Sequence, residues 1–259
     1  MKTKKILALV MSVIFMFSCC LSVAAANPVS GDILYVDTRT DAYNSQTGAT
    51  YKQETGTAYS FFTVKEYNNN PCYCIEKHAR FTRTRYKAVP LDNSTYWATL
   101  TATAREGIAL AAAFGYPAQT YSQLGVPSAD DAFVATQVVI WEYQTGIRTS
   151  ATNLTDNVYY NTVKGTPAET AYNTILTNIG KYVATPQYDG KTDDLVGFVN
   201  FTSESGSQEQ ELICFYGTTP EILSTGYIEI YKKNPDGALL DGAEFTVYDS
   251  NGSYVTTIL

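Results

Sequence analysis

The feature that most constrains this chain is a glutamine in the middle of an apolar helical stretch. Ser128 supplies a helix N-cap and Gly146 a stop signal, which predicts a helix over about residues 128–143. Within it Phe133, Gln137 and Trp141 recur at helical spacing and share one face. A buried amide without a partner costs about 1–3 kcal/mol, so Gln137 needs one. The simplest interpretation is a hydrogen-bonded core glutamine.

The hydrophobic pattern changes period twice along the chain. Alternating strand-like segments come first, helical spacing follows over residues 95–185, and strands return afterwards. We therefore expect an α+β fold with a helical insertion between strands. The expected strands are 31–37, 58–67, 72–77, 80–88, 195–201 and 211–216, and the expected helices are 96–114, 128–143 and 166–182.

A second short motif lies 63 residues before Gln137. It reads Tyr73-Cys74-Ile75, and the helix carries Thr136-Gln137-Val138-Val139-Ile140-Trp141. In this order the pair resembles the thioester domains of Gram-positive surface adhesins, and the resemblance spans most of residues 30–220. It implies a β-sandwich or barrel-like domain over residues 27–222 with an inserted helical subdomain. It also implies an internal thioester between the Cys74 thiol and the Gln137 side chain.

The resemblance implies a function in covalent binding. A lysine amine of a host surface or matrix protein would displace Cys74 and form an amide with Gln137, in a single turnover and without a cofactor. The surrounding pocket would include Tyr73, Glu76, Trp141 and Glu142. A protonated lysine needs a proton acceptor, and the candidates are Glu76, Glu142 and His78, each of which could equally be an ordinary surface charge.

Two other functions compete with covalent binding. A cysteine hydrolase or transamidase would pair Cys74 with His78, the single histidine, but residues four apart on a strand stand about 13 Å from each other. A turnover enzyme is therefore disfavoured. A lectin-like or protein-binding module would instead use the 21 tyrosines non-covalently and leave Cys74 and Gln137 unlinked.

The N-terminus has the pattern of a secretory signal peptide. Three lysines precede an apolar run over residues 6–17, and alanines at 24–26 offer a cleavage site. Of 18 Lys and Arg residues three lie in this segment, which leaves 15 against 25 Asp and Glu. This balance disfavours nucleic-acid binding, and no metal-ligand cluster stands out. We expect an exported monomeric tip of a larger protein, anchored to the cell wall through a region beyond Leu259.

The last part of the chain changes character after Pro220. Residues 223–259 resemble the start of a collagen-adhesin B-type, prealbumin-like β-sandwich with its motif over residues 240–245, but they are too few to close a core. The resemblance makes Lys232 the candidate lysine for an isopeptide bond, whose partner would lie beyond this piece. The alternative is a lysine extended along a sheet edge.

Three cysteines remain after the signal segment. Cys72 and Cys74 would share one strand face, so only the motif selects Cys74 for the thioester. Cys72 and Cys214 are then left as a candidate disulfide in an oxidising compartment, or as two buried free thiols.

Overall fold

The computed structural model describes most of the chain in two units, Met1–Ile222 and Leu223–Leu259. The expected domain bounds, 27–222 and 223–259, stay a prediction. The expected signal peptide, His78 and Lys232 lie outside the described residues. Those residues are 28, 30–55, 58–77, 79, 81, 85–151, 157–185, 195–200, 210–222, 233–238, 242, 244–248 and 252–258.

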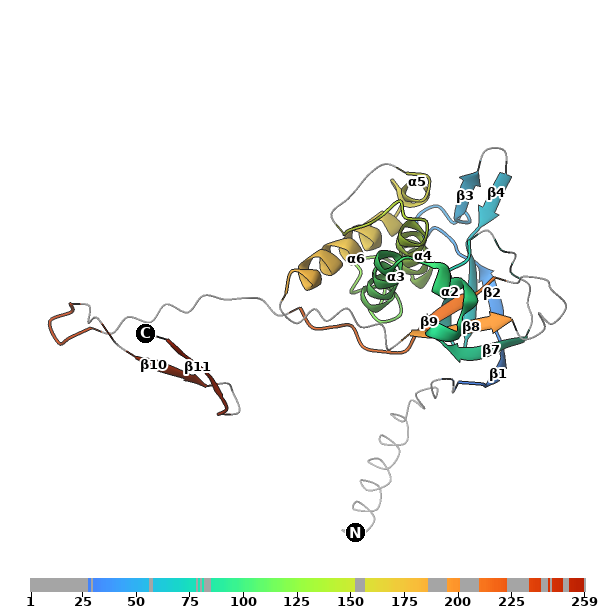
Figure 1. Cartoon of the computed structure of the whole chain (residues 1–259). Coiled ribbons are helices and arrows are strands. Elements are labelled where there is room, and N and C mark those ends of the chain that lie inside the picture. The colour runs from blue at the N-terminus through green and yellow to red at the C-terminus, as the bar shows by residue number, and fades with distance from the viewer. Residues whose placement is uncertain are drawn as a thin grey trace, which may run out of the picture. The chain divides into compact units, whose positions relative to one another are not determined.

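The first unit is built on a curled seven-stranded antiparallel sheet with strand order β1-β7-β8-β9-β6-β5-β2 (Figure 1). Cys74 ends β6, and the expected strands near residues 195 and 211 are β8 and β9 of the same sheet, which confirms that part of the prediction. The bounds are β1 Ile33–Tyr35, β2 Asp37–Asp41, β5 Thr63–Tyr67, β6 Asn70–Cys74, β7 Arg85–Pro90, β8 Leu195–Asn200 and β9 Leu212–Phe215.

A two-residue turn fixes the register of β6. Asn68 and Asn69 both have positive φ, 49° and 63°, and join paired residues Tyr67 and Asn70. Asparagine tolerates this conformation, and two such residues match the twist of a hairpin. The register places Cys72 opposite Lys65 and sends Cys72 and Cys74 to the same face of the sheet.

The expected strand over residues 58–67 is broken in two. Residues up to Phe61 form β4 (Ala58–Phe61), which pairs with β3 (Lys52–Thr55) outside the main sheet. The Phe62 N–H still donates to Tyr51, the residue before β3, but the Phe62 carbonyl accepts from the Ala42 N–H of another segment. The buried Phe62 ring holds this break, and β5 joins the main sheet after it.

The helices lie between β7 and β8 in the chain, so the mixed helix and sheet class is confirmed. The expected helix 96–114 is wrong in one respect, because it divides at Leu100. Leu100 is extended and Thr101 caps a new helix by accepting a hydrogen bond from the Ala104 N–H. The bounds are η1 Leu91–Asn93, α2 Thr95–Thr99, α3 Ala102–Phe114, α4 Ala129–Gln144, α5 Tyr160–Val163 and α6 Ala168–Val183.

Helix α4 is the buried centre of the first unit and confirms the expected helix around Gln137. The Ser128 hydroxyl caps its start by accepting from the Asp131 N–H, and its residues from Asp131 to Gln144 are all buried. Helices α3 and α6 and strand β6 pack against it. Gly107 of α3 permits the close approach, since a Cβ there would lie 2.1 Å from the Tyr143 ring.

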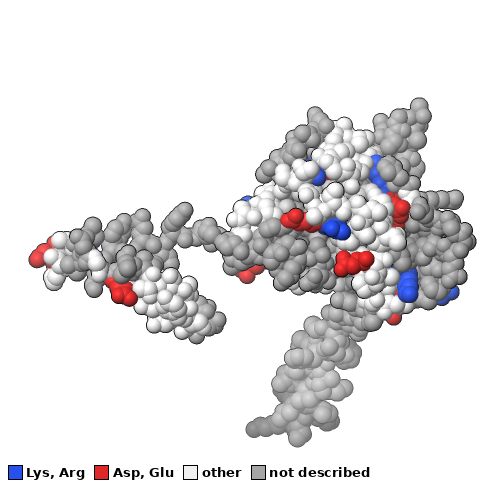
Figure 2. All heavy atoms as spheres, viewed as in Figure 1, with Lys and Arg blue, Asp and Glu red and all other residues white. Residues whose placement is uncertain are grey.

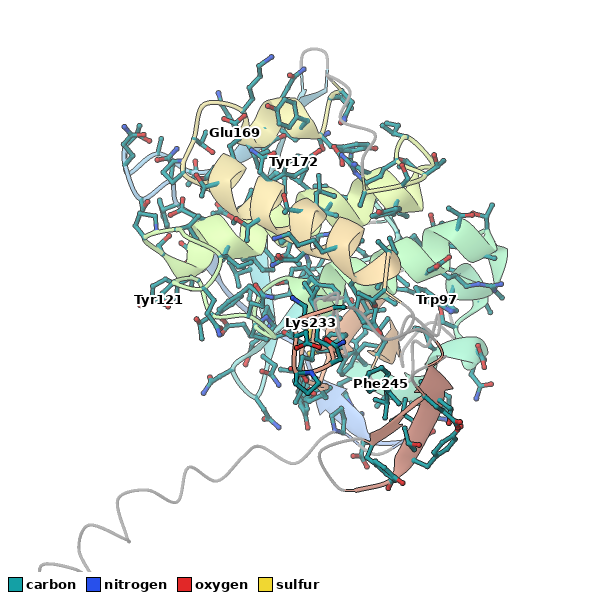
Figure 3. The ribbon with its side chains drawn as sticks, turned by 90° about the vertical axis from the view of Figure 1, so that its left-hand side faces the viewer. Trp97, Tyr121, Glu169, Tyr172, Lys233 and Phe245 are labelled. Carbon is teal, nitrogen blue, oxygen red and sulfur yellow. The ribbon has the colours of Figure 1, made fainter. Side chains whose placement is uncertain are left out.

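The second unit, by itself, shows an antiparallel hairpin of β10 (Phe245–Tyr248) and β11 (Tyr254–Ile258). Lys233 and Phe245, labelled in Figure 3, belong to this unit. Its prealbumin-like identity stays a prediction. In neither unit do the described residues include a helix long and apolar enough to span a bilayer.

Candidate functional site

Gln137 and Cys74 meet directly at the contact between α4 and β6. The Cys74 N–H donates to Oε1 of Gln137 at 2.8 Å, and Nε2 of Gln137 donates to the Cys74 carbonyl at 2.9 Å. Both residues are buried. The carboxamide thus has the partner that its burial requires, and that partner is the second motif.

The end of β5 explains why these backbone groups are available. Strand β5 pairs with β6 only as far as Cys72, opposite Lys65, while on the other side β9 continues to pair with Cys74. The Gln137 carboxamide therefore takes both backbone bonds of Cys74 on the side where the β5 ladder has ended. This geometry satisfies the core-glutamine interpretation and also holds the carboxamide against the residue that carries the thiol.

Thr136, the other polar residue of the helix motif, supports the same contact. Its hydroxyl donates to the Ala132 carbonyl at 2.8 Å and accepts from the Tyr116 N–H at 3.0 Å. The Tyr116 carbonyl in turn accepts from the Tyr73 hydroxyl, and the Tyr73 ring stacks on Phe133 at 5.1 Å. Thr136 of α4 and Tyr73 of β6 are therefore linked through the backbone of Tyr116, and the Tyr73 ring also packs on α4.

The Cys74 thiol lies in an apolar environment with a few donors. Burial raises its pKa to about 11, while the Lys65 charge, the Trp141 indole N–H and the Glu76 backbone N–H each act to lower it. The Trp141 Nε1 is otherwise buried without a hydrogen-bond partner among the described residues. A sulfur that gained negative charge would find donors already in place.

A pocket of about 250 Å³ opens beside Gln137. Aromatic rings form much of its wall, and two lysines, Lys65 and Lys77, supply its only charges among the described lining residues. The lining residues are Phe62, Thr63, Lys65, Lys77, Ala79, Phe81, Phe133, Gln137, Trp141 and Gln210. The pocket gives a small or extended ligand a route to the Gln137 carboxamide.

Of the residues expected around the thioester, only Trp141 lines this pocket. Tyr73 is fully buried and is not among the lining residues. Glu76 is half-buried, and its Oε2 accepts from the Glu211 N–H at 3.2 Å. Burial raises the pKa of Glu76, with a further contribution from the Glu211 charge. Glu76 therefore lies two residues after the cysteine, and its carboxylate is held by Glu211, the residue just before β9.

Glu142 does not line the pocket, and its expected place there needs correction. Its carboxylate forms a buried ion pair with Arg148 at 2.6 Å and accepts from the Tyr172 hydroxyl at 2.9 Å and from Asn157 at 2.8 Å. Tyr172 is labelled on α6 in Figure 3. Glu142 thus ties α4 to α6, and a carboxylate with these partners is poorly placed to accept a proton from a ligand.

Cys72 and Cys214 are buried free thiols in this structure. The pairing of Tyr73 with Ile213 makes them neighbours across β6 and β9. Burial and the adjacent Cys214 raise the pKa of Cys72, and Cys214 donates to the Pro71 carbonyl at 3.3 Å. Their disulfide stays a prediction.

Sequence reasoning missed the two pocket lysines and the buried arginine. Lys77 is three residues after Cys74, and Lys65 is on the preceding strand of the hairpin, so the hairpin signal could have found both. Arg148 follows the stop of the central helix and gave no comparable signal. Among the residues with described positions, no group of His, Cys, Asp and Glu is arranged to hold a metal ion.

Comparison with known proteins links the site to a family. Residues 71–181, which include Cys74 and Gln137, match the family model of the thioester domain. No curated protein matches the chain.

Two solved structures are similar. The N-terminal domain of the Streptococcus pyogenes pilus tip adhesin Cpa has 15% identity and a TM-score of 0.46, with 74% of this chain and 97% of that one covered. The thioester domain of the Enterococcus faecium TIE86 protein has 15% identity and a TM-score of 0.32, with 90% and 74% covered. The part of the chain that brings Cys74 and Gln137 together is thus similar to the thioester domain family.

Proposed function

We propose that this chain is a bacterial surface adhesin that binds a host protein covalently through a thioester between Cys74 and Gln137. The observation that carries the proposal is the pair of hydrogen bonds by which the buried Gln137 carboxamide is held on the backbone of Cys74. The match of one family model to a segment that contains both residues supports it.

Thioester formation needs only these two side chains. The Cys74 sulfur attacks Cδ of Gln137, the C–N bond breaks, and ammonia leaves with the thiol proton. An unreactive amide becomes an activated acyl group. Both residues are buried, and exclusion of water protects the new bond from hydrolysis.

Ligand attachment reverses the role of the sulfur. A ligand amine attacks Cδ of Gln137, the C–S bond breaks, and the Cys74 thiolate leaves and takes up a proton. Trp141 and the Glu76 N–H, which lower the pKa of Cys74, stabilise that leaving group. Because Gln137 ends as a stable amide, the protein acts once and is not a turnover enzyme.

The remaining proposals concern the setting of the site. We infer an exported, monomeric tip with the helices as an inserted subdomain, followed by a prealbumin-like stalk with Lys232 as its isopeptide lysine. The wall anchor would lie beyond this piece. A host surface or matrix protein that presents an accessible lysine is the expected partner.

Amine capture tests the proposal. Methylamine should add to Gln137 of the exported protein and free one thiol, and Cys74→Ala should abolish the addition. Cys72→Ala is the matched control, because Cys72 is a buried thiol on the same strand face and should leave the addition intact. Addition that survives Cys74→Ala would assign the reactivity to another group, and a wild-type protein inert to amines would favour a non-covalent binding module.

A further inference from the structure

Lys77 is a pocket residue that the thioester itself does not use. It is three residues after Cys74 and is half-buried. Its ammonium lies 4.0 Å from the centre of the Tyr159 ring and 5.4 Å from that of Trp141. It lines the same open pocket of about 250 Å³ as Gln137, so its amine and the carboxamide border one small space.

The charge of this pocket is unfavourable for a protonated ligand. Lys65 from β5 and Lys77 are its charged lining residues, no carboxylate lines it among the described residues, and Cys74 and Tyr159 are the other titratable groups beside Lys77. A ligand ammonium would meet two positive charges and no counter-ion. Since a protonated amine is also no nucleophile, the ligand must lose a proton at or near the pocket.

Lys77 is suited to take that proton, and Lys65 is less so. Burial lowers the pKa of Lys77 to about 8. At pH 7 roughly a tenth of such an amine is unprotonated, against about one in 2,500 for an ordinary lysine. Lys65 is buried, lies 5.0 Å from the Phe81 ring, and its charge acts to lower the pKa of Cys74. Lys77 is only half-buried, so it can pass a proton on to water.

We propose that Lys77 is the base that deprotonates the incoming ligand amine in the pocket beside Gln137, an inference that rests on the proposed thioester. Neutral Lys77 accepts a proton from the ligand ammonium. The freed amine attacks Cδ of Gln137, the C–S bond breaks, and the Cys74 thiolate leaves. The proton that the new amide nitrogen loses neutralises the thiolate, and Lys77 releases its proton to solvent.

Two substitutions separate a base from a simple charge. Lys77→Met keeps the apolar stem and removes the amine. Lys77→Arg keeps a positive charge over Tyr159 and Trp141 but cannot lose its proton at these pH values. Both should slow methylamine addition at pH 7 on the order of 10²-fold, a usual contribution of a positioned base. Lys181→Met, an exposed lysine near the end of α6, is the matched control and should react at the wild-type rate.

The pH profile gives a second readout. The rate of methylamine addition to the wild type should level off above pH about 8, where Lys77 is neutral. The rates of both variants should keep rising to pH about 10 to 11, the range in which a free alkylamine such as methylamine loses its proton. Intact mass before amine addition monitors the thioester independently, through the loss of one ammonia.

Several results would overturn the proposal. If Lys77→Arg adds methylamine at the wild-type rate, Lys77 contributes only its charge. If Lys77→Met adds methylamine faster than wild type, Lys77 hinders the reaction, and if it adds methylamine at the wild-type rate, Lys77 has no part in it. A variant with full mass would place Lys77 in thioester formation, and a Lys77–Gln137 amide in the digested wild type would make it a competing nucleophile. A wild-type protein of full mass, in contrast, removes the thioester itself.

Discussion

Loss of the cross-link should lower the stability of the first unit by an amount that its loop length sets. A Cys74–Gln137 bond closes a loop between residues 63 apart. By the chain-entropy relation used for disulfides, a loop of that size contributes about 4 kcal/mol at 25 °C. Cys74→Ala removes the bond but keeps the backbone N–H and carbonyl that hold Gln137, so the free energy of unfolding should fall by about 4 kcal/mol.

Tryptophan fluorescence during urea unfolding measures this change in the first unit alone. The two tryptophans of the chain, Trp97 and Trp141, are both buried there. Methylamine-treated wild type, which has the Cys74 thiol but no cross-link, is the control and should be destabilised to a similar extent. Equal unfolding free energies for untreated wild type, treated wild type and Cys74→Ala would refute a covalent link.

The other predictions concern the unlinked site and its supports. In a Cys74→Ala background, Gln137→Ala should lower the free energy of unfolding by a further 2–6 kcal/mol, because each of the two buried backbone groups left unsatisfied costs about 1–3 kcal/mol. Urea unfolding measures this change, and the absence of an added cost would contradict the hydrogen bonds. Arg148→Met should cost about 3–5 kcal/mol, since it leaves the Glu142 carboxylate buried without its ion-pair partner. Glu142→Gln with Arg148→Met should recover part of that loss, and a double variant no better than Arg148→Met would argue against the pair. The methylamine-opened protein should lose stability between pH about 9 and about 11, because the folded pKa of Cys74 is raised and its protonated form is favoured below that range. Cys74→Ala should lack the part of this loss that Cys74 contributes, although the buried Cys72 thiol still contributes its own. Identical alkaline profiles for the two proteins would contradict the prediction.

The sequence predicted the centre of the site because both of its parts are local patterns. A capped helix with an amide on its apolar stripe and a short strand after an asparagine turn are visible without tertiary structure. The break at Leu100 was missed although Thr101 is a capping residue, since the alanine-rich composition suggested one continuous helix. The break at Phe62 depends on hydrogen bonds to distant segments, and no local pattern carries that information.

The assignment of Glu142 to the pocket failed because adjacency in sequence was taken for adjacency in space. Glu142 is five residues after Gln137, which places the two about 140° apart around a helix of 3.6 residues per turn. It therefore faces α6 and Arg148 while Gln137 faces β6. Lys77 and Lys65 converge on the pocket from two positions of the hairpin segment, and their shared burial appears only once the helices cover the sheet. On the face shown in Figure 2, charged side chains of the described residues are scattered among uncharged ones.

The mass of the freshly exported wild-type protein tests the central claim most directly. With the thioester, the intact protein should weigh one ammonia less than its processed sequence, and digestion without added amine or thiol should give one cross-linked species that contains both Cys74 and Gln137. Cys74→Ala should have its full mass. A wild-type protein of full mass whose Cys74 and Gln137 peptides separate would contradict the account and leave Gln137 as a hydrogen-bonded residue of the core.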